Sequence, residues 1–304
     1  MSRIFEAIKN ERPVGFRELF RDHDKLSVEP AESRGQCDVE AAAALSWSPE
    51  SVPFKRLRVS AVSPLFPFDD GHRMASDQYR IIRTKILHSA GKPQLIVVSS
   101  PSSGDGKTIT AINLAASFAL KEGARVLLVD GDFRRPRISE VLGVRGKGLQ
   151  DVLDGSSGLQ SALVRAEEIP NLFLLCAGNI MENASELLDS ERWQAVIRQI
   201  RPNFSTVIFD APPIAALADY ELLQLACDGV VVVVRPDHTE RAGCLNALQT
   251  IPGQKLLGVV LNAVEDWWLW KPPICGYYPK PFPERPRSDS SQSEISARRD
   301  TVTT

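Results

Sequence analysis

Short runs of apolar residues alternate with segments of helical spacing through the middle of the chain. Each run is continuously apolar, which is typical of parallel strands that are covered on both faces. The runs cover residues 95–98, 126–129, 172–175, 207–209, 230–234 and 256–261. Strands that alternate with helices in this way predict an α/β fold: a mostly parallel central sheet with helices on both faces.

The intervening helices are indicated by apolar residues that recur on one face. Tyr79, Ile82 and Ile86 mark such a face before the first strand. Further along, Asn183 with Glu186 resembles a capping box, and we expect it to open a single helix. The apolar face of that helix would hold Trp193, Val196, Ile197 and Ile200. Two more helices are predicted, one from Asp219 and one over residues 240–251.

The two ends of the chain have a different composition. Residues 1–10 form a short amphipathic helix in this interpretation, with Ile4, Phe5 and Ile8 on a face that needs its own domain, a partner or a membrane interface to cover it. Residues 11–71, rich in Pro, Ser and charge, predict a disordered linker, and residues 266–304 a largely disordered tail. The Trp cluster at 267–270 either packs back on the domain or meets a membrane interface. Residues 72–265 therefore form the folded domain.

Composition restricts the function classes. The 304 residues carry a net charge of −2, so nothing indicates a general affinity for nucleic acid or anionic lipid. The five cysteines are scattered without a CxxC pair, as expected for buried thiols in a reducing compartment. No apolar run is long enough to span a bilayer, and the first residues have no signal-peptide core. We therefore expect a cytoplasmic protein.

The first apolar run ends in the segment SSPSSGDGKT, which indicates a phosphate-binding P-loop between a strand and a helix. The loop contains Ser103, Gly104, Asp105 and Gly106. These residues are small or flanked by glycine, so their backbone amides can approach phosphate oxygens. Lys107 would supply a positive charge for the β- and γ-phosphates, and Thr108 a hydroxyl for Mg²⁺. One departure from the usual pattern is Pro101 in place of the first glycine. The sequence therefore predicts a nucleoside triphosphate site.

Acidic residues follow two other strands. Asp130, Asp132 and Arg134 come after a strand expected to lie next to the first one, and Asp210 ends the strand of VIFDAPP. Ligands in open α/β sheets bind at the carboxyl ends of strands, so these side chains are candidates for Mg²⁺ binding and chemistry. Asn262 ends the last strand, where its amide is placed to meet a purine base. His238 follows another strand, and a lone histidine in a loop is usually without function.

Together, SPSSGDGKT, VLLVDGDFR and VIFDAPP resemble, in this order, the Walker A, Walker A′ and Walker B boxes of the bacterial tyrosine kinases of capsule and exopolysaccharide biosynthesis. The resemblance covers roughly residues 74–264, and it implies a P-loop NTPase fold of three layers with ATP and Mg²⁺ as cofactors. The related partition ATPases usually carry an extra lysine early in the loop, where this chain has Ser102. Its absence favours the kinase branch, while an ATPase switch of the partition or septum-site type stays the alternative.

The resemblance also implies roles for residues. Lys107 and the loop amides would hold the phosphates, and Thr108 with Asp210 or Asp130 would bind Mg²⁺. Asp132 or Asp130 would accept the proton of a tyrosine hydroxyl, and Arg134 would steady the loop or the transferred phosphate.

Two further family features have partial counterparts. The Glu-x-x-Arg-x-x-Arg element that mediates ring-like self-association is matched by Asp77, Arg80 and Arg83, although a solvated charged face explains them equally. The tyrosine-rich tail is reduced to Tyr277 and Tyr278, which are either phosphoacceptors or part of an aromatic patch. A membrane polysaccharide co-polymerase on another chain is the activator that the resemblance implies, and it would recruit the kinase to the inner face of the plasma membrane.

Overall fold

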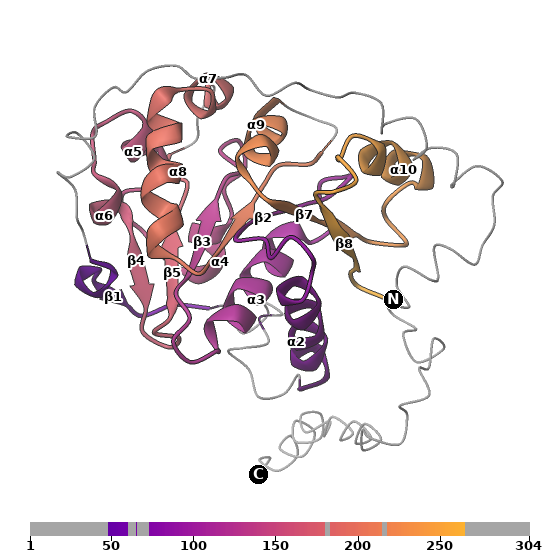
Figure 1. Ribbon diagram of the computed structural model, residues 1–304, viewed down its shortest axis with the longest axis horizontal. Helices are drawn as coiled ribbons and strands as arrows, with labels where there is room; N and C mark the ends of the chain where they lie inside the picture. The colour runs from indigo at the N-terminus through magenta and orange to yellow at the C-terminus, as the bar shows by residue number, and fades with distance from the viewer. Residues whose placement is uncertain (1–47, 60–64, 66–72, 180–182, 215–217, 265–304) are drawn as a thin grey trace, which may run out of the picture. The chain divides into compact units, whose positions relative to one another are not determined.

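The computed structural model describes residues 48–59, 65, 73–179, 183–214 and 218–264 (Figure 1). The predicted N-terminal helix at 1–10 and the tail at 266–304, with Tyr277, Tyr278 and the Trp cluster, lie outside the described residues. Within them, no helix is both long and apolar enough to cross a bilayer.

An eight-stranded sheet forms the centre of the domain, with the order β1-β4-β5-β3-β6-β2-β7-β8. All neighbouring strands are parallel except β4 and β5, so the predicted α/β class with a mostly parallel sheet is confirmed. The strands are β1 (Phe54–Lys55), β2 (Leu95–Ser99), β3 (Val126–Asp130), β4 (Val164–Ala166), β5 (Leu172–Leu175), β6 (Thr206–Asp210), β7 (Gly229–Val234) and β8 (Leu256–Leu261).

Helices cover both faces of this sheet, as Figure 1 shows for α8 and α3. They are α2 (Arg73–Leu87), α3 (Lys107–Ala119), α4 (Ile138–Leu142), α5 (Leu149–Leu153), α6 (Leu159–Ala162), α7 (Ala184–Leu188), α8 (Glu191–Asn203), α9 (Ala218–Ala226) and α10 (Arg241–Gln249). A short 3₁₀ turn, η3, spans Pro49–Ser51.

The alternation of side chains along each strand divides the core into two layers. Leu95 and Val97 of β2 pack with residues of α5 to α10, whereas Ile96 and Val98 pack with residues of α2, α3 and α4. Because both faces are covered, β2, β3, β6 and β7 are buried along their whole length. This double coverage is the reason that these strands are continuously apolar in sequence.

The strand order decides where a ligand can bind. The chain passes from β2 to β3 on one side, and β6 returns between them before β7 forms on the other side of β2. We expected β3 to be the neighbour of β2. This prediction is wrong, because β6 lies between them. The register places Asp130 directly beside Asp210 and Asp210 beside Val98. Connections that leave in opposite directions from β2 create a crevice at its carboxyl end.

Two sequence predictions need correction. The linker predicted over 11–71 is wrong for residues 48–59, where β1 pairs with β4 and Val52 and Leu57 are buried in the core. The single helix expected from Asn183 is two helices, α7 and α8. Asn183 makes no side-chain cap, and Ser190 caps α8 instead by accepting a hydrogen bond from the Trp193 amide at 3.2 Å.

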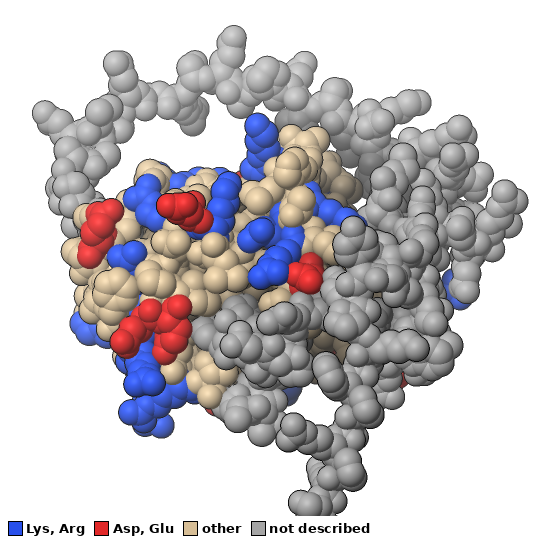
Figure 2. All heavy atoms as spheres, turned by 90° about the horizontal axis from the view of Figure 1, so that it is seen from below, with Lys and Arg blue, Asp and Glu red and all other residues tan. Residues whose placement is uncertain are grey.

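Charges of both signs share the surface. On the face seen from below, Lys and Arg side chains lie among Asp and Glu side chains (Figure 2). Such interspersed charges create no extended field of one sign on the part of this face that is described.

Candidate active site

The P-loop connects β2 to α3 at the crevice, as the sequence predicted. Gly104 and Gly106 adopt φ values of 94° and 93°, a left-handed conformation that other residues adopt only with strain. Gly106 is the residue that precedes the first turn of α3, which begins at Lys107. The unpaired amides and positive end of this helix therefore face the space at the carboxyl end of β2, where a phosphate would bind.

Lys107 is enclosed by carboxylates. Its Nζ donates to Asp132 Oδ2 at 2.7 Å and lies 3.7 Å from Asp210 Oδ1, and its side chain is only 10% exposed. Burial alone would lower the pKa of Lys107, but the charges of Asp210 and Asp132 outweigh burial, so the pKa is raised. Lys107 is therefore a firmly charged ammonium at the centre of the crevice.

Asp210 is the carboxylate with unused bonding capacity. It is fully buried, and among the described residues no donor lies within hydrogen-bond distance of either oxygen, since the Lys107 ammonium is 3.7 Å from Oδ1. Burial raises the pKa of Asp210, opposed by the charge of Lys107 and by the nearby Thr108 hydroxyl. A buried carboxylate whose positively charged neighbour is a lysine, and which lies beside a hydroxyl, fits Mg²⁺. This ion binds through one or two protein oxygens and keeps waters and substrate phosphates as its other ligands.

Asp130 has a different environment although it lies beside Asp210 in the sheet. Its Oδ2 accepts the Arg137 and Ile138 amides at 3.1 and 3.0 Å, and its Oδ1 accepts the Asp132 amide at 3.3 Å. Burial and the adjacent Asp210 raise the pKa of Asp130 to about 8. These bonds hold the loop from β3 to α4, so Asp132 projects toward Lys107 from a fixed backbone.

Arg134 points away from Lys107 and toward α9. Its Nε donates to Asp219 Oδ2 at 2.9 Å, which ties the loop after β3 to the first turn of α9. Its neighbour Arg135 reaches the P-loop instead, with Nη1 3.5 Å from Ser103 Oγ. The sequence reasoning did not single out Arg135, and its position directly after Arg134 was the one available signal.

Asn262 contacts the P-loop. Its Nδ2 donates to the carbonyl oxygen of Asp105 at 2.9 Å, and a side chain at Gly106 would overlap its amide. The amide that we expected to meet a base thus also fastens the loop that binds the phosphates.

From the sequence we discounted His238 as a lone loop histidine and did not name Thr239, yet both contact the P-loop. Both contact Asp105 Oδ1, His238 through Nδ1 at 2.9 Å and Thr239 through its hydroxyl at 2.7 Å. No sequence motif indicated this contact, because the partner, Asp105, lies more than 130 residues earlier in the chain.

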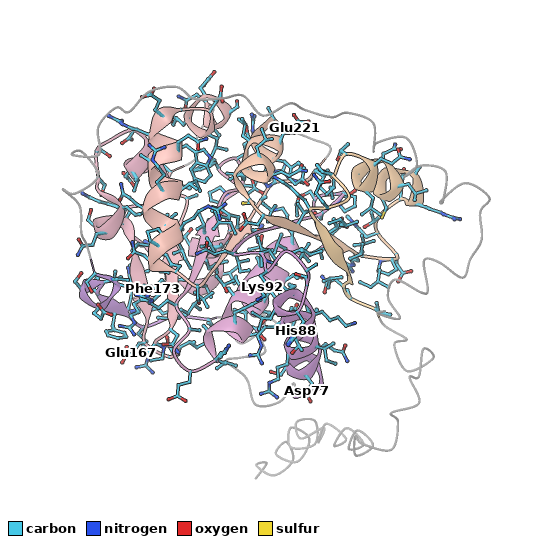
Figure 3. All side chains as sticks on the ribbon, in the orientation of Figure 1. Asp77, His88, Lys92, Glu167, Phe173 and Glu221 are labelled. Atoms are coloured by element: carbon cyan, nitrogen blue, oxygen red, sulfur yellow. The ribbon has the colours of Figure 1, made fainter. Side chains whose placement is uncertain are left out.

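The predicted association residues Asp77, Arg80 and Arg83 lie on α2. Figure 3 shows Asp77 at the lower end of that helix. Asp77 and Arg80 form an ion pair within α2 at 2.7 Å. Arg83 donates from Nη1 to the Ser117 carbonyl of α3 at 2.6 Å, so it also attaches α2 to the domain.

Comparison with known proteins identifies the family of the domain. A family model described as an AAA domain matches residues 93–256. The tyrosine-protein kinase YwqD of Bacillus subtilis is 35% identical over 208 residues, which are 67% of this chain and 86% of that protein. The chain belongs to the bacterial tyrosine-protein kinase family.

Other members agree. The tyrosine-protein kinase CpsD of Streptococcus pneumoniae is 34% identical over 197 residues, covering 64% of this chain and 86% of that protein. The crystal structure of the chimerical protein CapA2B2 has a TM-score of 0.61 and 32% identity, over 67% of this chain and 91% of its own. The match confirms the P-loop fold and the family that the three boxes indicated.

Proposed function

We propose that the protein is an ATP- and Mg²⁺-dependent protein-tyrosine kinase that phosphorylates Tyr277 and Tyr278 in trans and regulates exopolysaccharide or capsule synthesis. The observation that carries the proposal is the fully buried Asp210, whose oxygens have no hydrogen-bond partner within the described part of the chain, beside Lys107 at the carboxyl end of β2. A loop that only bound phosphate would not need such a costly carboxylate. The names of the relatives supply the acceptor, a tyrosine.

Binding begins with Lys107 in this mechanism. The phosphates of ATP compete with Asp132 for the Lys107 ammonium, while the amides of Ser103 to Thr108 surround the phosphate oxygens. Thr108 and Asp210 would hold Mg²⁺, with Asp130 behind them. When bound, Mg²⁺ would neutralise charge on the phosphates and on the leaving oxygen.

Release from Lys107 leaves Asp132 available as a base. The tyrosine oxygen bonds to the γ-phosphorus, the bond from that phosphorus to the oxygen of the leaving ADP breaks, and the tyrosine proton passes to Asp132. Arg134, held by Asp219, keeps the loop after β3 in place.

The regulation of the kinase that we propose is the one that the family resemblance implies. We propose ring-like self-association through Asp77, Arg80 and Arg83, which would bring the tail of one copy to the crevice of the next. A membrane polysaccharide co-polymerase would activate the kinase and recruit it to the inner face of the plasma membrane.

A phosphotyrosine assay tests the activity. The purified protein is incubated with Mg²⁺ and ATP, with and without a co-polymerase fragment, next to Lys107→Ala and the double variant Tyr277→Phe/Tyr278→Phe. We expect phosphotyrosine in the wild type alone. ATP hydrolysis without phosphotyrosine, even with the fragment, would refute the kinase and favour the ATPase switch.

A mixing experiment tests transfer in trans. Lys107→Ala, enlarged by a tag, keeps its tyrosines but has lost its own activity, and the double tyrosine variant keeps its activity but has no acceptors. Phosphotyrosine on the enlarged chain after mixing is the expected result. If the enlarged chain carried no phosphotyrosine while the wild type was active in a parallel reaction, transfer between copies would be excluded.

A further inference from the structure

Asp105 is a charged side chain in an unusual place. It lies between the two left-handed glycines of the P-loop, and it is 0% exposed. Carboxylates are almost never fully buried unless they are paired. A negative charge here would also repel a triphosphate in the same loop, so its retention needs a reason.

Three donors satisfy the Asp105 carboxylate. Oδ2 accepts the Ser102 amide at 2.9 Å, within the loop itself. Oδ1 accepts the hydroxyl of Thr239 at 2.7 Å and the Nδ1–H of His238 at 2.9 Å. The backbone of the same residue is held by Asn262, as described above.

The two side-chain donors are themselves positioned. The Thr239 hydroxyl accepts the Arg235 amide at 3.1 Å, which directs its hydrogen toward Asp105. The His238 ring lies over Gly104, with Cε1 3.3 Å from the place that a Cβ would occupy. Both residues belong to the connection from β7 to α10, so a separate part of the domain grips the P-loop.

We infer that Asp105, His238 and Thr239 form a clasp that holds the P-loop in its phosphate-binding shape, with His238 and Thr239 as positioning residues that set the affinity for ATP. Glycine-containing loops have much backbone freedom to lose, and a loop ordered in advance loses none of it when ATP binds. The clasp residues do not approach the reacting atoms as assigned above, so the clasp acts on binding and not on the transfer rate. The inference rests on the proposed ATP site.

The test compares Thr239→Val, which removes the hydroxyl at nearly constant shape, with Thr239→Ser, which keeps it. Thr250→Val is the matched control, because the hydrogen bond that the described structure gives the Thr250 hydroxyl goes to the Ala247 carbonyl near the end of α10. Titration with Mg²⁺ and a fluorescent ATP analogue gives Kd, and the phosphotyrosine assay gives KM and kcat. Thr239→Val loses the hydrogen bond to Asp105 and the one accepted from the Arg235 amide. We expect the loss of the bond to Asp105 to raise Kd and KM about three- to tenfold at unchanged kcat. Thr239→Ser and Thr250→Val should stay within about twofold, the scatter of a neutral substitution.

A double-mutant cycle shows whether the effect passes through Asp105. In an Asp105→Ala background, Thr239→Val should change Kd no further, whereas a general loss of stability would add to the first effect. If Thr239→Val fails to fold, His238→Ala takes its place, because His238 is exposed and its substitution leaves the core intact.

The outcomes separate the clasp from the proposed function. Wild-type Kd in Thr239→Val, or a fall in kcat at constant KM, would overturn the clasp. ATP binding without phosphotyrosine refutes only the kinase, since Kd still reports the clasp. A wild type that binds no ATP would refute both.

Discussion

Lys107, Asp132 and Asp210 share one small volume in which two negative charges face one positive charge, with Asp130 behind them. Backbone amides donate hydrogen bonds to the Asp130 carboxyl, whose pKa is raised to about 8, and Lys107 compensates the charge of Asp132. The charged partner of Asp210 among the residues that the structure describes is Lys107, at 3.7 Å. Its charge is thus retained at a cost to stability that a bound cation would offset.

Asp210→Asn should therefore stabilise the protein while it weakens ATP binding. The amide removes a buried charge whose pKa burial raises, and Lys107 keeps its shorter ion pair with Asp132 at 2.7 Å. We expect the free energy of unfolding without nucleotide to rise by about 1–2 kcal/mol. Urea unfolding at pH 7 measures this, and titration with ATP should show that Mg²⁺ no longer improves affinity. A less stable variant would contradict the account.

Gly106→Ala should abolish nucleotide binding for a steric reason. A methyl group at this left-handed position would overlap the Asn262 amide that fastens the P-loop. Gly123→Ala is the matched control, because Gly123 also has a positive φ of 70° but open space around it.

The control isolates the strain of the backbone from the overlap. We expect it to lose about 1 kcal/mol of stability and to bind ATP normally. Gly106→Ala/Asn262→Ala should recover part of the binding, measured by the same titration. Equal losses of binding in Gly106→Ala and Gly123→Ala would show that the overlap is irrelevant.

At the scale of elements, the strands were the predictable part. The apolar runs of β2, β3, β6 and β7 follow from coverage on both faces, and the carboxyl ends of β2, β3 and β6 bring the P-loop and the two acidic boxes together. β1 could not be predicted, because Phe54–Lys55 is too short for a pattern and depends on pairing with β4.

The missed details share one cause. The insertion of β6 between β2 and β3, the contact of Asp105 with His238, and the start of α8 at Ser190 depend on parts of the chain that meet only after folding. Local patterns indicate which residues are buried and where strands end, but they do not identify partners that are far apart in sequence.

Asp228 connects three elements at the end of the sheet opposite the crevice. Its Oδ2 accepts the Leu95 and Gln94 amides at 2.8 and 3.0 Å at the start of β2, and its Oδ1 accepts Arg201 of α8 at 2.8 Å. Partial burial alone would raise the pKa of Asp228, but the bonds from Arg201 and the two amides outweigh it and lower the pKa. The folded protein therefore favours the charged form.

Asp228→Asn should cost about 1–3 kcal/mol near pH 7, because a charged acceptor is replaced by a neutral one. A lowered pKa gives stability that is present above the unfolded value of 3.8 and is lost as the pH falls through the folded value. The difference between wild type and variant should thus shrink below about pH 4. Urea unfolding from pH 7 to pH 3 measures it, and a constant difference would exclude this role.

At the scale of the whole molecule, α2 carries both the predicted association residues and a contact that holds the domain together. Arg80 is 55% exposed and pairs only with Asp77 of its own helix among the described residues. Arg83 donates to a carbonyl of α3. The two arginines can therefore be separated by experiment, although a family motif treats them alike.

Arg80→Glu should dissociate the proposed ring at a small cost to stability, because it replaces an exposed pair worth about 0–1 kcal/mol by a like-charge pair with Asp77 of similar size. Arg83→Ala should lower both the mass and the Tm, since the Ser117 carbonyl loses a charged donor worth about 1.5–3 kcal/mol. Sedimentation velocity and thermal unfolding measure the two quantities.

Arg198→Glu is the control, a similar charge reversal at an exposed position on α8, over the opposite face of the sheet. If it dissociated the ring equally, or if Arg80→Glu kept its mass while the wild type formed a ring, the association surface would not be α2. Tail phosphorylation in trans should fall with the mass in Arg80→Glu, because the crevice would no longer lie beside a neighbour's tyrosines.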